Sequence, residues 1–137
     1  MQDTPDKTTL LAGVARFLKE EVLPNTTDRA RAFRVRIAAH LVASVAREIT
    51  AEETHDGAEL ARLVKLLDPP FDPPSGEAAR RVILTAQNDR LADAILQGDP
   101  ALDVEAARAH VMETLREKLA VNQPRFDTRL DPESPEA

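Results

Sequence analysis

The chain has 137 residues, no cysteine and a formal net charge of −6 at pH 7. This length fits one domain, the lack of cysteine excludes disulfides and thiolate metal sites, and the acidic balance argues against nucleic acid as a partner. No apolar run approaches the ~20 residues that a membrane helix needs, and the first residues do not resemble a leader peptide, so we expect a cytoplasmic protein without a membrane partner.

The first predicted helix runs from Lys7 to Leu23, and Pro24 ends it. Its expected buried face consists of Leu10, Val14, Phe17, Leu18 and Val22. Glu21 falls within that face, where an unpaired carboxylate is costly. We therefore expect Glu21 to pair with an arginine of the central or the last helix.

The second predicted helix covers residues 28–49, with Asp28 as its N-cap. This segment is apolar on nearly every side, which is typical of a helix in the middle of a bundle. We expect it to be the least exposed helix. One polar seam interrupts the apolar surface, and it consists of Arg29, Arg36, His40 and Arg47.

Thr50 and Glu53 have the spacing of a capping box, which predicts that the central helix ends near Ile49 and that a third helix begins at Thr50. The third helix should turn four aliphatic residues inward: Leu60, Leu63, Val64 and Leu67. Four prolines in residues 68–74 then predict an extended connection across the bundle, with Phe71 as an anchor.

The fourth predicted helix covers residues 76–97, before Gly98, and the fifth covers residues 103–120. The fourth should turn Leu84, Leu91 and Ile95 to one side, together with Asn88. The fifth should bury Val104, Val111, Leu115 and Leu119, with Arg108 in the same stripe and His110 at the surface. Residues 127–137 are acidic and aperiodic, as in a disordered tail. The sequence thus predicts an all-α single-domain bundle of about five helices over residues 7–126.

The sequence offers little that points to catalysis. It has no Gly-rich phosphate loop, no Gly-x-Ser-x-Gly elbow and no cysteine nucleophile. Glu52 and His55 have the spacing used in di-iron bundles, but the only other such pair, His110 and Glu113, runs in reverse order. We therefore predict no metal, no cofactor and no catalytic residue.

Several polar residues nevertheless fall on positions that the helical pattern turns inward: Glu21, Arg36, His40, Asn88 and Arg108. In a small bundle they could meet in one hydrogen-bonded network. The favoured interpretation is that this network only fixes how the helices pack. The alternative is that Arg36, His40 and Arg47 bind an anion such as a phosphate or a carboxylate.

Three segments of the chain, residues 17–24, 33–48 and 118–126, resemble a family of small bacterial helical domains of unknown function, family 6285. Members of that family are commonly encoded beside an acyl-CoA dehydrogenase and an aminoglycoside-phosphotransferase-like kinase. An asparagine usually stands there in place of His40, which argues against His40 as an acid or base. The resemblance implies a helper protein in acyl-CoA or hydroxyacyl-group metabolism.

Three functional hypotheses follow from these observations. The preferred one is a non-catalytic accessory subunit that docks on the neighbouring dehydrogenase-like or kinase-like enzyme. An exposed helix face, or the segment formed by Asn122, Pro124, Arg125 and Phe126, would make that contact. The alternative is a protein that binds a small anionic ligand at Arg36, His40 and Arg47, or a weak enzyme that acts on one. Phosphate is one such ligand, and coenzyme A is the one that the family resemblance implies. The third, a homo-oligomer with structural duties, is compatible with the first.

Overall fold

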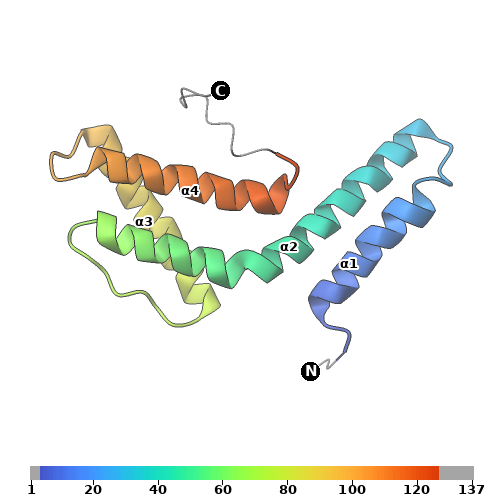
Figure 1. The fold of residues 1–137 in the computed structure, drawn as a ribbon, viewed down its shortest axis with the longest axis horizontal. Coiled ribbons are helices and arrows are strands. Elements are labelled where there is room, and N and C mark those ends of the chain that lie inside the picture. Colours follow the sequence, from blue (N-terminus) through green and yellow to red (C-terminus); the bar gives the residue numbers. More distant parts are fainter. Residues whose placement is uncertain (1–3, 127–137) are drawn as a thin grey trace. The chain divides into compact units, whose positions relative to one another are not determined.

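The computed structural model describes residues 4–126, and every regular element within them is a helix (Figure 1). The elements are α1 (Lys7–Phe17), a π-helical turn η1 (Leu18–Val22), α2 (Arg29–Leu66), α3 (Glu77–Gln97) and α4 (Val104–Asn122). The all-α prediction is confirmed, with four α-helices in place of five. The predicted tail at 127–137 lies outside the described residues. Among the described helices, none combines the length and the apolar character needed to cross a membrane.

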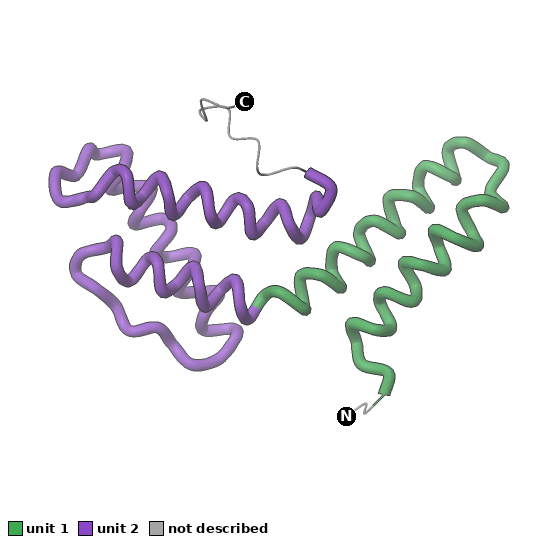
Figure 2. Tube along the Cα trace, viewed as in Figure 1, with its two compact units in different colours: residues 1–52 green, residues 53–137 purple. Residues whose placement is uncertain are grey.

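The chain forms two compact units, residues 1–52 and residues 53–137 (Figure 2). Unit 1 is a hairpin of α1 and the first part of α2. Unit 2 contains the rest of α2, then α3 and α4. The long helix α2 therefore belongs to both units.

The predicted break between a second and a third helix is wrong, because α2 continues through Thr50 as one helix of 38 residues. The Thr50 hydroxyl donates to the backbone oxygen of Ala46 at 2.9 Å, the bond that a threonine makes inside a helix. Glu53, the other half of the expected capping box, lies 3.7 Å from Arg80 of α3. No glycine or proline stands between Ala46 and Glu53, so nothing stops the helix there.

In unit 1, the buried residues are small. They are Ala15, Ala39, Ser44 and Ala46. The prediction of a buried face on the first helix is wrong for its large members, because Leu10, Val14 and Phe17 are 42%, 49% and 51% exposed. The expectation that the central helix is the least exposed fails for the same reason, since Leu41 is 57% exposed. The hairpin is thus closed by alanines rather than by an aliphatic core.

Both α1 and α2 begin with an aspartate that caps the helix. Asp6 accepts a hydrogen bond from the Thr9 amide at 2.7 Å, and Asp28 accepts one from the Arg31 amide at 2.9 Å, as predicted for the start of the central helix. Between them, the Leu23 amide donates to the Leu18 oxygen, which makes the wider π-helical turn. A π turn holds an extra residue, so the 100° periodicity of α1 does not extend beyond it.

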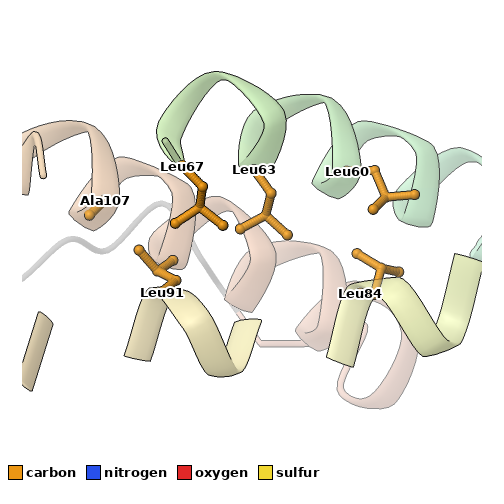
Figure 3. Packing of buried hydrophobic residues seen from close by; sticks show 6 residues of the cluster. All are labelled: Leu60, Leu63, Leu67, Leu84, Leu91 and Ala107. Carbon is orange, nitrogen blue, oxygen red and sulfur yellow. The ribbon is translucent and has the colours of Figure 1, made fainter. Parts of the chain in front are cut away.

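The apolar core lies in unit 2, where leucines of α2 face leucines of α3 (Figure 3). Its fully or nearly fully buried members are Leu60, Leu63, Leu67, Leu84, Leu91 and Ala107. Phe71 of the proline-rich connection packs against this core, as predicted. Gly98 ends α3 in the left-handed conformation, with φ of 64°, which glycine adopts without strain.

Four predicted inward positions are wrong in this unit. Ile95 of α3 is 50% exposed, and Val104, Val111 and Leu115 of α4 are exposed as well, while Leu119 is half-buried. The inner face of α4 carries instead Ala107, His110 and Thr114, all buried. The small side chain of Ala107 lets α4 approach the leucine core, and Thr114 accepts a hydrogen bond from Arg62 of α2.

Candidate functional site

A polar cluster joins α2 to α4 at the side of the leucine core. The Arg62 guanidinium donates two hydrogen bonds to the Glu117 carboxylate, Nη1 to Oε1 at 3.1 Å and Nη2 to Oε2 at 2.7 Å. Nη2 also donates to the Thr114 hydroxyl at 3.3 Å. The side chains of Arg62 and Glu117 are only 26% and 15% exposed. This two-pronged geometry is the strongest form of arginine–carboxylate contact.

The charge state of Arg62 is fixed by the same contact. The hydrogen bonds that Arg62 donates to Glu117 raise the pKa of the Arg62 guanidinium, against the opposing effect of partial burial, and the negative charge of Glu117 adds to this rise. The guanidinium therefore stays charged and stays paired. An arginine held in this way is a structural clamp between helices rather than a group waiting for an anion.

His110 lies in the same cluster and is 4% exposed, so the prediction that it is a surface residue is wrong. Burial lowers the pKa of the His110 imidazole, and the nearby positive charge of Arg62 lowers it further. Its Nδ1 atom is buried without a hydrogen-bond partner among the described residues. The imidazole is therefore favoured in its neutral form.

A second polar contact lies between α2 and α3. The side-chain amide of Asn88 donates to the Glu59 carboxylate at 2.7 Å and to the backbone oxygen of Leu84 at 3.0 Å. Glu59 is 7% exposed, so this amide supplies a hydrogen bond that water could not easily replace. Asn88 thus contributes to a buried polar contact, with a carboxylate that the sequence analysis had not singled out.

The residues of the predicted network lie in both compact units, with Glu21, Arg36 and His40 in unit 1 and Asn88 and Arg108 in unit 2. Glu21 is exposed, so its expected burial in an arginine pair is wrong, because the π-helical turn moves it off the face extrapolated from Phe17. Arg36 and His40 are exposed on α2. Arg47 is half-buried and donates to the Ser44 hydroxyl at 3.0 Å.

The remaining predicted residues lie toward the end of unit 2. Arg108 is exposed on the outer side of α4. Asn122 is the last residue of α4, and the Phe126 amide donates to the Gln123 oxygen at 2.8 Å in the turn that follows. Phe126 is 62% exposed, and Pro124 and Arg125 are exposed beside it. This segment is therefore open to a partner.

A cleft of about 350 Å³ opens where α2 ends, beside α3 and the turn that leads to α4. Its polar centre is Arg90, which donates to the Gln87 side chain at 2.7 Å and to the backbone oxygen of Asp68 at 3.2 Å. The bond to Asp68 ties the proline-rich connection to α3, and the bond to Gln87 lies within α3. Asp68, Asp93 and Asp99 share the lining, so the cleft does not favour an anion over a cation.

The principal charged groups of the polar cluster bind one another. Glu117 accepts from both Nη atoms of Arg62 and Glu59 accepts from Asn88, while the Arg62 Nε and the His110 Nδ1 are buried without a hydrogen-bond partner among the described residues. Within residues 4–126, no group of three or more histidines and carboxylates could hold a metal ion. What the arrangement can do is fix the rotation of α4 against α2.

Four residues of these polar contacts are not predicted by the apolar pattern of the sequence: Glu59, Arg62, Thr114 and Glu117. One signal was present. Ala107, His110, Thr114 and Glu117 follow the spacing of one helix face, with small and polar side chains only. A search restricted to apolar periodicity passes over such a face.

Comparison with known proteins gives a family and no further relatives. Residues 24–126 match the family described as a domain of unknown function, DUF6285. No curated protein and no solved structure matches the chain. Because the match extends over well more than half of the sequence, the protein belongs to the DUF6285 family.

Proposed function

We propose that the protein is a non-catalytic accessory subunit that docks on an enzyme through the outer face of α4. The observation that carries this proposal is the exposure of an apolar stripe on that helix, which is interrupted only by the exposed Arg108 between Val104 and Val111. Val104, Val111 and Leu115 are 67%, 41% and 48% exposed. Spacings of seven and four residues place them in one line along the helix.

The segment of residues 122–126 follows α4 directly, and its Phe126 is a further exposed apolar side chain. Lys118 of α4 and Arg125 of this segment are exposed basic residues, in a chain whose net charge is −6. An apolar strip with a basic border favours a protein partner that presents an apolar groove with an acidic rim.

The proposed partner is an acyl-CoA dehydrogenase-like or an aminoglycoside-phosphotransferase-like protein. This choice is supported only by the context that the family resemblance implies. An accessory role is supported by the polar cluster, whose strongest donors and acceptors bind one another. A catalytic role would need reactive groups with unsatisfied hydrogen-bonding capacity facing a pocket.

The test is binding between the purified full chain and the purified dehydrogenase-like or kinase-like protein encoded next to it, measured by isothermal titration. We expect a stable complex with one of the two. Leu115→Asp places a charge in the centre of the stripe and should weaken binding at least about tenfold. A matched control is Leu96→Asp on α3, where the leucine is 83% exposed but lies outside the stripe. No binding to either protein, or equal loss with both variants, would contradict the proposal.

A further inference from the structure

The part of α2 that belongs to unit 1 carries a row of four large apolar side chains. Phe33 and Leu41 are each 57% exposed, Ile37 is 42% exposed and Val45 is 43% exposed. Residues four apart lie one above another on a helix, so these four form a single row. Leu41 stands about 160° around the helix from the buried Ala39. The row therefore lies roughly opposite the buried Ala39 and Ala46, while the buried Ser44, about 60° from Leu41, accepts a hydrogen bond from Arg47.

Unit 1 buries little apolar surface of its own that could stabilise the hairpin of α1 and α2. The buried residues within 4–52 are three alanines and one serine, and no large side chain in that range is buried. A two-helix hairpin with so little buried apolar surface is marginal by itself. Four further exposed apolar residues on consecutive turns then indicate that another helical surface covers them.

The charges beside the row point to a second copy of the same chain. Arg34 and Glu48 lie near its two ends, both exposed. Each is within about 20° of the direction of Leu41. The row is thus basic at its start and acidic at its end, which makes it complementary to itself when one copy is turned around.

An antiparallel arrangement about a two-fold axis satisfies both the apolar and the charged residues. With the axis between Ile37 and Leu41, these two residues face each other across the axis, and Phe33 faces Val45 of the second copy. Arg34 then lies within one helical turn of Glu48 of the second copy, a separation that these side chains can bridge.

We propose that the protein forms a two-fold dimer in which the first halves of two α2 helices pack antiparallel along this row. A parallel arrangement would place Arg34 against Arg34 and Glu48 against Glu48, which is repulsive. The contact is of the self-complementary kind that two-fold symmetry requires. It is independent of the docking proposed for α4.

Sedimentation velocity of the full chain tests the dimer directly. We expect a species of twice the chain mass of 15.1 kDa at micromolar concentration. Leu41→Asp should give the mass of a single chain, while Leu96→Asp, far outside the row, should leave the dimer intact. A wild-type chain that stays at 15.1 kDa up to about 100 μM would overturn the proposal.

A charge swap tests the antiparallel register with changes that do not disturb the fold. Arg34→Glu alone and Glu48→Arg alone should each raise the dimer Kd at least about tenfold, because each places like charges together. The double variant Arg34→Glu/Glu48→Arg restores opposite charges and should return Kd to within about threefold of the wild type. A double variant as weak as the single ones would overturn the register, and circular dichroism of each variant checks that the helices are kept.

Discussion

Arg62 on α2 and Glu117 on α4 lie 55 residues apart in the sequence and form a two-pronged ion pair with distances of 2.7 and 3.1 Å. Their side chains are mostly buried, and Thr114 adds a third hydrogen bond to the guanidinium. The pair lies beside the leucine core and sets which face of α4 turns toward α2. It thereby also decides which face of α4 is left outside.

Removing the carboxylate of this pair should destabilise unit 2. Glu117→Ala leaves the Arg62 guanidinium partly buried without its counter-charge, and we expect the free energy of unfolding to fall by about 2 kcal/mol. Urea unfolding followed by circular dichroism measures the change. The control is Glu113→Ala, because Glu113 forms a more exposed pair with Arg116, at 48% and 42% exposure, and should cost less than about 0.5 kcal/mol.

His110 should make the stability depend on pH. Its pKa is lowered in the folded protein, by burial first and by Arg62 second, so below pH 6.5 the unfolded chain binds more protons than the folded one. The stabilising contribution is therefore complete above pH 6.5 and is lost as the pH falls from 6.5 toward the lower folded pKa.

Unfolding experiments between about pH 7.5 and pH 5 would measure this effect. In His110→Gln, the part of the pH dependence of the unfolding free energy that is due to this imidazole should disappear. His40→Gln changes an exposed histidine on α2 and should leave that part in place. A proton NMR titration that places the His110 midpoint above 6.5 would contradict the prediction.

The helix boundaries that depend on local residues could be predicted from the sequence. Pro24 ends the first helical segment, Gly98 caps α3 and Asp103 caps α4 by accepting from the Ala106 amide. Each of these acts within one turn, through proline's missing amide, glycine's left-handed φ or a side-chain acceptor. The leucines of the core, among them Leu63, could also be predicted, because they recur at the regular spacing of one helix face.

The rotation of α4 could not be predicted in this way. The apolar periodicity predicts that Val111 faces the core. In the structure His110 is buried instead, and it points about 100° away from Val111 around the helix. The difference depends on the partner that Glu117 finds on α2, and a single sequence carries no record of that partner. The same holds for Glu59 and Asn88, whose contact joins two helices across 29 residues.

The sign of the stability change in Thr50→Ala distinguishes one continuous helix α2 from two helices that meet at Thr50. If Thr50 capped a new helix, Thr50→Ala would cost about 1 kcal/mol. Within one continuous helix, where the exposed Thr50 bonds back to the Ala46 oxygen, alanine is the better helix former. We therefore expect Thr50→Ala to raise the free energy of unfolding by up to about 0.5 kcal/mol. A clear loss in urea unfolding would favour two helices over one.

The last prediction concerns the anion-binding alternative at Arg36, His40 and Arg47. Arg36 and His40 are exposed on a helix surface, and Arg47 already donates to Ser44, so the structure does not gather three donors around one point. We expect phosphate, nucleotides and coenzyme A to leave the melting temperature of the full chain unchanged. A ligand that binds only the folded state at 100 times its Kd would add about 2.7 kcal/mol to the free energy of unfolding.

A gain of that size corresponds to a rise in melting temperature of roughly 5 °C or more, which thermal-shift measurements resolve easily. The decisive comparison uses coenzyme A with the wild type and with Arg47→Ala. A rise for the wild type that disappears in Arg47→Ala would restore the ligand-binding hypothesis. Equal curves with and without ligand for both proteins would leave Arg47 as a residue that stabilises α2 through Ser44, and docking through α4 as the function to pursue.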